Sequence, residues 1–405
     1  MIFLQHINPI MSIPKILIPA SKSLSNRWLI LQYLYPALQI NNLSTAKDTE
    51  VLQKALKNIK QGKTHINIGH AGTAMRFLTA LFSSLDGQDF VLEGSARMHQ
   101  RPIKILVDAL KQLGADISYL ENEGYPPLAI KGKKLNKSQV TIAQNVSSQY
   151  ISALMLIAPS LPEGLHINLS GNQVSKPYVQ MTASILNSLG IKVLQKNNSI
   201  KIYSAKSLLH KTVNIEGDWS SASYFYGLAS LYNTPDYFLS PFFPDSWQGD
   251  QKIAGYFSSL GIITSYESNG IRLTKKTDFI LPTYLEFHLI DTPDLAQTLA
   301  VTCLALGIRC KLTGLQTLRI KETDRLAALQ TEIKKLGANV NITDNSFELT
   351  NPVVNKQNVR IDTYDDHRMA MSFAILQKKF PGIIINNPEV VIKSFPDFWQ
   401  KFNLV

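Results

Sequence analysis

A predicted helix that ends in Leu-Gly and is followed by a β-branched strand recurs four times along the chain. The four glycines are Gly114, Gly190, Gly261 and Gly337, at successive spacings of 76, 71 and 76 residues. Such a glycine supplies the left-handed residue that ends a helix. Solenoid repeats have shorter periods of ~20–50 residues, so this spacing favours a small α/β module used several times. The alternative is coincidence, because Leu-Gly helix ends are common.

The length of the chain indicates more than one hydrophobic core. Its 405 residues exceed the ~250–300 at which a single hydrophobic core stops growing, so we expect at least two domains. A boundary is expected near residues 213–225, where a strand pattern passes through Gly217 and Asp218 into a new helix. This boundary divides the chain nearly in half.

The cysteines and the apolar runs indicate the compartment. Cys303 and Cys310 lie in one apolar stretch, which excludes a disulfide framework and a multi-cysteine metal site. The first residues lack a basic segment followed by a long apolar run, and no 18 consecutive residues are apolar. We therefore expect no signal peptide, no transmembrane helix and a cytoplasmic protein.

The charge points to an anionic partner. Lys and Arg total 41 against 30 Asp and Glu, a net charge of +11. A basic excess of this size suits nucleic acid, a membrane surface or a small acidic substrate.

Four segments join a polar turn to a helix that carries a cation near its start. In the first, Lys22, Ser23 and Arg27 stand beside free backbone N–H groups, a suitable cradle for phosphate or carboxylate. In the second, Gly72 and Arg76 open a helix that matches neither a Walker A loop nor a dinucleotide-binding fingerprint. For both segments, an ordinary capped helix or tight turn is the alternative.

The other two segments add carboxylates. Lys321, Glu322 and Arg325 lie at the entrance of a helix, where the carboxylate is either part of a structural ion pair or an acid/base group. Asp366, His367 and Arg368 open the last long helix, with no spacing typical of a metal site.

Several further residues lie in similar turns. Ser147, Ser148 and Gln149 precede an apolar helix and offer neutral hydrogen-bonding groups, and Asp294 falls in the first turn of another. Additional cations in turns are Arg97, Arg101 and Lys393.

Taken in order, these motifs resemble the 5-enolpyruvylshikimate-3-phosphate (EPSP) synthase family, the 3-phosphoshikimate 1-carboxyvinyltransferases. The resemblance extends from SKSLSNR at residues 21–27 to KSFPDF at 393–398. It implies an α/β fold of two lobes, each an inside-out α/β barrel of three repeated units. The implied lobes are residues 1–20 with 217–405, and residues 21–216, with the active site in the cleft between them.

The resemblance also implies the activity. The family transfers the enolpyruvyl group of phosphoenolpyruvate to the 5-hydroxyl of shikimate 3-phosphate and releases phosphate, without metal or cofactor. We expect these two small molecules as partners, no nucleic acid, no membrane and a monomeric enzyme. The family is the target of glyphosate.

Matching motif positions assign site residues by resemblance. Phosphoenolpyruvate is expected to contact Lys22, Gly72, Arg101, Gln149, Arg325, Arg368 and Lys393. Shikimate 3-phosphate is expected to contact Lys22, Ser23, Arg27, Ser147, Ser148, Gln149, Ser175, Tyr178, Asp294 and Lys321. The catalytic residues are expected to be Asp294, which takes the hydroxyl proton, and Glu322 with Lys22, which serve the enol methylene.

The chain departs from the family pattern at a few places. Ala20 replaces a glycine, His70 replaces an asparagine and Phe77 replaces a proline. Because His70 and Phe77 are expected beside the phosphoenolpyruvate pocket, we expect weakened inhibition by glyphosate.

Two alternatives to this function remain open from the sequence. A UDP-N-acetylglucosamine enolpyruvyl transferase usually carries a reactive cysteine where GSARMHQRPIK stands here, and this stretch has none. A nucleic-acid-binding protein would suit the charge, but no aromatic-interleaved basic stripe occurs.

Overall fold

The computed structural model describes residues 13–143, 147–171, 175–355 and 358–405. One β-α-β-α-β-β unit recurs in it. In one copy, β3 (His65–Asn67) and β4 (Asp89–Glu93) are parallel and joined by α3 (Gly72–Ser84). Then α4 (Lys104–Gln112) leads to the hairpin of β5 (Asp116–Tyr119) and β6 (Leu128–Lys131), which gives the sheet order β3-β4-β6-β5.

Three further four-stranded sheets have the same strand order. The second unit consists of β7 (Gln139–Ala143), α5 (Ser148–Ile157), β8 (Leu165–Ser170), α6 (Lys176–Ser188), β9 (Val193–Lys196) and β10 (Ser199–Ile202). The third consists of β1 (Lys15–Leu17), α7 (Trp219–Ser230), β12 (Tyr237–Ser240), α8 (Ile253–Ser258), β13 (Ile262–Glu267) and β14 (Gly270–Lys275). The fourth consists of β15 (Tyr284–His288), α9 (Ala296–Leu306), β16 (Arg309–Thr313), α10 (Arg325–Lys335), β17 (Asn339–Ile342) and β18 (Ser346–Asn351).

The recurring glycines end helices as predicted. Gly114, Gly190, Gly261 and Gly337 have φ of +100°, +78°, +83° and +96°, and each stands between the second helix of its unit and the strand that follows. The helix–glycine–strand prediction is therefore confirmed at all four positions.

Two shorter units complete the α/β fold. In one, β2 (Leu38–Asn41) follows α1 (Lys22–Leu34) and precedes α2 (Lys47–Lys60) in the chain. It pairs in parallel with β11 (Lys211–Asn214). In the other, β19 (Arg360–Ile361) pairs in parallel with β20 (Ile384–Ile385) across α11 (His367–Gln377), and α12 (Phe398–Phe402) ends the chain.

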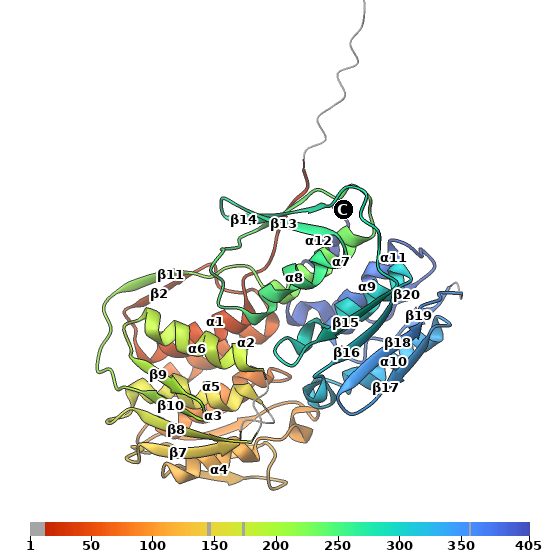
Figure 1. The fold of residues 1–405 in the computed structure, drawn as a ribbon. Helices are drawn as coiled ribbons and strands as arrows, with labels where there is room; N and C mark the ends of the chain where they lie inside the picture. The colour runs from red at the N-terminus through yellow and green to blue at the C-terminus, as the bar shows by residue number, and fades with distance from the viewer. Residues whose placement is uncertain (1–12, 144–146, 172–174, 356–357) are drawn as a thin grey trace, which may run out of the picture.

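The first helix of each four-stranded unit is buried, and the sheets lie outside these buried helices (Figure 1). Every residue of α7 is buried, as is every residue of α9 from Ala296 to Ala305. Helices that are apolar nearly all round belong in a core rather than on a surface. Thus α1, α3 and α5 pack against one another, and α7, α9 and α11 do the same.

The core forms two separate hydrophobic clusters. One contains buried residues from Ala20 to Ile215. The other contains Ile16 and Ile18 together with residues from Trp219 to Phe402. The chain passes between the clusters twice, and the two crossings lie side by side, because Ala20 bridges Gly217 and Ser21 N–H donates to the carbonyl of Glu216. Among the described residues, none of the helices has the length and apolarity needed to span a membrane.

Candidate active site

One cleft between the two clusters is lined largely by the starts of helices. From the first cluster come N-terminal residues of α1, α2, α3, α5 and α6, and from the second those of α7, α10 and α11 and the 3-10 turn Pro293–Leu295 that precedes α9. The first N–H groups of a helix have no partner within it, and the helix dipole makes that end positive. The cleft therefore attracts anions before any side-chain charge is considered.

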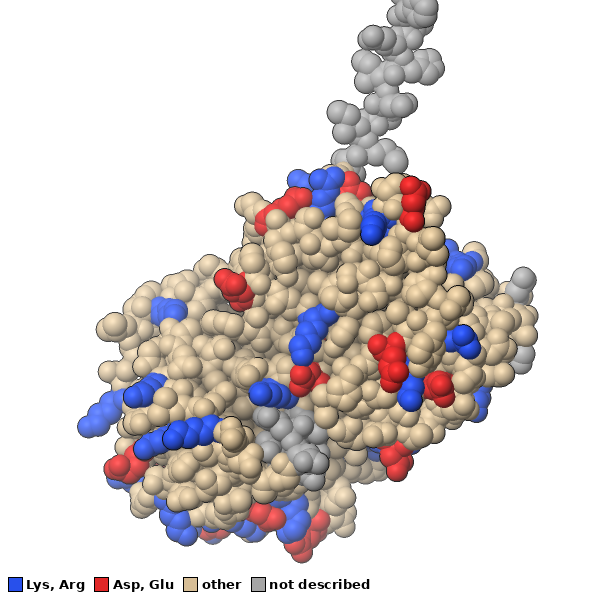
Figure 2. All heavy atoms as spheres, viewed as in Figure 1, with Lys and Arg blue, Asp and Glu red and all other residues tan. Residues whose placement is uncertain are grey.

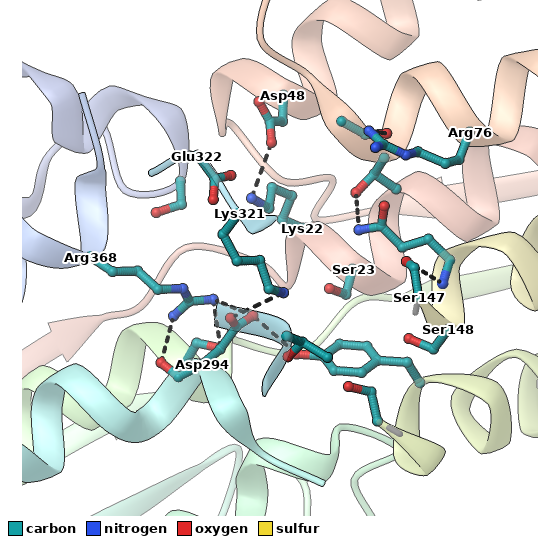
Figure 3. A pocket seen from close by; sticks show the side chains of 18 of the residues that line it. Lys22, Ser23, Asp48, Arg76, Ser147, Ser148, Asp294, Lys321, Glu322 and Arg368 are labelled. Carbon is teal, nitrogen blue, oxygen red and sulfur yellow. Dashed lines mark hydrogen bonds and ion pairs between the residues drawn. The ribbon is translucent and has the colours of Figure 1, made fainter. Parts of the chain in front are cut away.

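Serine residues cap the helices on one wall. Ser21 Oγ accepts the N–H of Leu24 at the start of α1, and Ser147 Oγ accepts the N–H of Gln149 at the start of α5. Ser23, Ser147 and Ser148 line the cleft as neutral donors and acceptors (Figure 3). Gln149 Nε2 donates to Thr73 Oγ1 at 3.2 Å, which holds its amide at the mouth of α3.

Arg27 is buried behind these serines. Its Nε donates to Thr182 Oγ1 at 2.8 Å and its Nη1 to the carbonyl of Ser23 at 2.8 Å, while Nη2 donates to Ser152 Oγ at 3.1 Å. Burial lowers the pKa of Arg27 to about 10, so the side chain remains charged at neutral pH. The guanidinium thus fixes the wall as well as lining the cleft.

Asp294 is the meeting point of three cations on the opposite wall. Its Oδ1 lies 3.4 Å from Nζ of Lys321, and its Oδ2 lies 3.1 Å from Nη2 of Arg368 (Figure 3). Oδ1 also lies 2.8 Å from Nη1 of Arg325. Burial alone would raise the pKa of Asp294, but the three cations outweigh burial and hold it well below its usual range. Asp294 is therefore ionised in the unliganded cleft.

Glu322 is the second ionised carboxylate of the cleft. Its Oε1 lies 2.8 Å from Nζ of Lys393, and its Oε2 lies 2.9 Å from Nη2 of Arg325. Burial opposes its charge, but Lys393, Arg325 and then Arg101 keep its pKa well below the usual value.

Arg325 connects both carboxylates to a third. Its side chain is 2% exposed, and its Nε lies 2.6 Å from Oδ2 of Asp366, a residue that is fully buried and caps α11. The sequence shows why Arg325 is so placed: Asp324 caps α10 through two N–H groups, and Leu326, Leu329 and Leu336 turn inward. This leaves the first residue of α10 beside the cleft.

Two further guanidinium groups lie beside the start of α3. A Cβ built on Gly72 would lie 2.6 Å from Nη1 of Arg101 and 2.9 Å from Nη1 of Arg76. Burial and then the charge of Arg101 lower the pKa of Arg76 to about 10. Two cations so close together favour an anion between or beside them.

Lys22 completes the set from the start of α1. Its Nζ lies 3.1 Å from Oδ2 of Asp48, a residue of α2 that is 6% exposed (Figure 3). Lys22 and Asp48 both line the cleft.

The residues singled out from the sequence lie together, with one at the edge. Every residue assigned to a substrate or to catalysis lines the cleft except Lys393, which reaches Glu322 from a neighbouring pocket that also contains Arg97, Arg101 and His70. Phe77 is 1% exposed and is not itself among the lining residues, but its ring lies 5.5 Å from the guanidinium carbon of Arg27, which does line the cleft; its position beside the phosphoenolpyruvate pocket stays a prediction.

Other lining residues have no clear sequence signal. In the sequence, Asp48 is indistinguishable from any acidic residue in the first turn of a helix. The pattern around Asp218, Ser220 and Ser221 indicates only a domain boundary. Arg97 donates from Nε to the carbonyl of Glu322 at 3.1 Å, a contact between residues far apart in the chain that no local pattern encodes. His367, by contrast, belongs to a motif that the sequence shows. Its burial, and after that the positive charges of Lys22 and Arg368, lower the pKa of its imidazole well below 6.5, so the ring is neutral.

The outer surface differs from the cleft in its charge pattern. On the face shown in Figure 2, Lys and Arg side chains are spread over both halves and interspersed with Asp and Glu, so this face has no continuous basic stripe. Within the part of the chain that the structure describes, no three His, Cys, Asp or Glu residues are grouped so as to hold a metal ion.

Known proteins match both the sequence and the fold. The family model described as EPSP synthase (3-phosphoshikimate 1-carboxyvinyltransferase) matches residues 38–402. The 3-phosphoshikimate 1-carboxyvinyltransferase of Bacteroides fragilis is 44% identical over 95% of this chain and 93% of the relative. That of Shewanella pealeana is 36% identical over 95% of both chains.

Two solved structures share the fold at lower identity. The EPSP synthase of Acinetobacter baumannii has a TM-score of 0.73 at 21% identity and covers 96% of both chains. The enolpyruvyl transferase NikO from Streptomyces tendae has a TM-score of 0.71 at 13% identity, covering 96% of this chain and 93% of that one.

Proposed function

The chain belongs to the EPSP synthase family, and we propose that the cleft described above carries out the family reaction with the residues assigned below. That reaction transfers the enolpyruvyl group of phosphoenolpyruvate to the 5-hydroxyl of shikimate 3-phosphate and releases phosphate. One observation carries the proposal: helix N-termini and converging cations surround the two ionised carboxylates Asp294 and Glu322.

The substrates require such a site. Together they bring two phosphates and two carboxylates into one small volume, where their mutual repulsion must be overcome. Arg binds such groups bidentately, and Lys binds them as a point charge. We assign phosphoenolpyruvate to the cation-rich part of the cleft, with the contacts Lys22, Gly72, Arg101, Gln149, Arg325, Arg368 and Lys393.

The serine-rich wall suits the second substrate. Hydroxyl and amide groups bind a polyol, and the starts of α1 and α5 bind its phosphate. We assign shikimate 3-phosphate to Lys22, Ser23, Arg27, Ser147, Ser148, Gln149, Ser175, Tyr178, Asp294 and Lys321. Tyr178 supports this placement, because its hydroxyl lies 3.4 Å from Asp294 and so borders both walls.

The carboxylates supply the proton transfers. Asp294 takes the proton of the 5-hydroxyl as that oxygen attacks C2 of phosphoenolpyruvate, and Glu322 with Lys22 protonates C3. The resulting tetrahedral intermediate loses a C3 proton to the same groups as the C–O bond to phosphate breaks. In the unliganded cleft Lys393 and Arg325 hold the Glu322 pKa low. Substrate anions that draw these cations away raise that pKa and let Glu322 carry a proton.

The test of the function is phosphate release from purified protein. Release should require both substrates together, and Lys22→Ala should slow it about 100-fold, because one fixed cation at the developing charge is removed. Lys201→Ala, on the exposed face of β10, is the matched control and should release phosphate at the wild-type rate. No release by the wild-type protein, or undiminished release by Lys22→Ala, would refute the proposal.

Gly72→Ala should weaken phosphoenolpyruvate binding. The added Cβ forces Arg101 and Arg76 away from the start of α3, because it would lie within 3 Å of both guanidinium groups. We expect the KM for phosphoenolpyruvate to rise about tenfold, a typical effect of overpacking, while the KM for shikimate 3-phosphate changes little. Gly255→Ala, where a Cβ meets nothing within 4 Å, is the control. Equal effects on both KM values would contradict the placement.

We also propose the domain division and the state of the enzyme. The two hydrophobic clusters support lobes of residues 21–216 and of 217–405 with the N-terminal segment, of which residues 1–12 lie outside the described part. Buried free cysteines at 303 and 310 suit the reducing cytoplasm. A monomer is expected, and sedimentation at micromolar concentration tests it.

A further inference from the structure

Asp250 is a buried carboxylate one layer behind the cleft. It lies on the 3-10 turn Gly249–Lys252, is 5% exposed and is not among the described residues that line the cleft. Its Oδ2 accepts a hydrogen bond from the hydroxyl of Ser220, and its Oδ1 has no hydrogen-bond partner among the described residues. A buried carboxylate with so few partners is costly to the fold. Asp250 therefore calls for a functional explanation.

Ser220 connects Asp250 to the cleft. This serine lies in the first turn of α7 and lines the cleft, and its Oγ accepts a hydrogen bond from Nη2 of Arg368 at 3.3 Å. A hydroxyl has a single hydrogen. Because that hydrogen is directed to Asp250, a lone pair of Oγ is left to face Arg368. Without the carboxylate, the hydroxyl is free to turn its hydrogen toward the guanidinium.

Arg368 has two anchors on Nη2, and the reaction disturbs one of them. Besides Ser220, Nη2 donates to Oδ2 of Asp294 at 3.1 Å. In the assignment above, Asp294 accepts the substrate proton and Arg368 binds the carboxylate of phosphoenolpyruvate. The Asp294 carboxylate then weakens as a partner of Nη2, and Ser220 is the anchor of Nη2 that remains, beside the 3.4 Å contact of Nη1 with the carbonyl of Asp294.

We propose that Asp250 is a positioning residue that acts through Ser220 to orient Arg368 toward the carboxylate of phosphoenolpyruvate. The inference rests on the proposed function, because it assumes that Arg368 binds this substrate. Asp250 contacts no reacting atom. Its effect falls on phosphoenolpyruvate binding and leaves shikimate 3-phosphate binding unchanged.

The energetic cost of Asp250 separates this role from a structural one. Burial, and after it the negative charge of Asp294, raise the pKa of Asp250 to about 7. Arg368 and the hydrogen bond from Ser220 oppose this rise. The side chains of Asp218 and Tyr178 also face the Asp250 carboxyl group. A carboxyl whose pKa is raised on folding loses stabilising protonation as the pH rises through that value. At pH 8 the neutral variant Asp250→Asn should therefore melt no lower than the wild-type protein.

The test is a double-mutant cycle on purified protein at pH 8. Asp250→Asn replaces the charged acceptor with an amide that is also able to donate, and Ser220→Ala removes the link. Each single variant should raise the KM for phosphoenolpyruvate about five- to tenfold, as expected for a lost charge-assisted hydrogen bond. The KM for shikimate 3-phosphate and kcat should stay within twofold. The double variant should equal the single variants, because both interrupt one chain of hydrogen bonds.

The outcomes separate this inference from the proposed function. Asp236→Asn removes a carboxylate that pairs with Arg272 on the outer sheet, and it should leave both KM values unchanged. An active wild-type enzyme with an unchanged KM for phosphoenolpyruvate in both single variants would overturn the inference alone. So would multiplicative effects in the double variant, or a lowered melting temperature accompanied by equal changes in both KM values. A wild-type protein inactive with both substrates would instead overturn the function.

Discussion

Arg325→Gln is expected to cause the largest combined loss of activity and stability in this enzyme. Arg325 is 2% exposed and contacts three carboxylates, those of Asp294, Glu322 and Asp366. Asp294 retains Arg368 and Lys321, and Glu322 retains Lys393, but Asp366 loses its guanidinium partner in a fully buried position. Removing one partner of a buried ion pair typically costs about 3–5 kcal/mol.

The catalytic loss should exceed what the stability loss explains. Arg325 is assigned to phosphoenolpyruvate, so we expect kcat/KM for this substrate to fall at least about 1,000-fold, as when several transition-state contacts are lost together. Kinetics and thermal melting of the same preparation check both effects. Arg309→Gln, exposed on β16 of the same half, is the control for surface charge.

Arg325→Lys separates charge from geometry. Lysine keeps the positive charge but supplies a point contact in place of the fork that reaches three carboxylates. We expect this variant to recover most of the melting temperature and little of the activity. If Arg325→Lys were as active as the wild type, the guanidinium geometry would play no part in catalysis.

Glu322→Gln is expected to give the second large loss, in kcat alone. The amide keeps the shape of the side chain, and its single oxygen still accepts from either Lys393 or Arg325, but it no longer takes up or gives a proton at C3. General acid–base groups typically contribute about 10²–10⁴-fold, and kcat should fall in that range. The KM for phosphoenolpyruvate should not rise, because an anion that competes for Lys393 and Arg325 is removed.

Glu286→Gln, exposed on β15, removes an equal charge from the same half of the molecule and should leave kcat unchanged. A Glu322→Gln enzyme with kcat within threefold of the wild type would exclude Glu322 as the group that serves the methylene.

Much of the fold could be predicted because its signals are local. The four helix-ending glycines are visible in the sequence, since each requires positive φ at a fixed place in its unit. The two short units gave no such signal. Helix α2 ends at Lys60, and Gln61 rather than leucine precedes Gly62, while α12 ends within three residues of the C-terminus. The topology itself depends on pairing between distant strands, such as β1 with β12, which periodicity does not encode.

Some residues of the site could likewise be predicted from local sequence signals, and others could not. Lys22, Gly72, Arg325 and Arg368 could be proposed because each stands at a helix start in a recognisable motif. Partners from distant elements could not, because a pair such as Arg368 and Ser220 meets only through tertiary packing across 148 residues.

The proposed addition and elimination at phosphoenolpyruvate, performed by Asp294 and Glu322 within this cleft, is tested most directly by the product made in D2O. Proton NMR of the reaction of wild-type enzyme with both substrates should show an enolpyruvyl ether at C5 of the ring, one per phosphate released. Deuterium should enter its methylene, because C3 becomes a methyl group in the intermediate. Pyruvate and phosphate without the ether, or an ether whose methylene carries no deuterium, would contradict it.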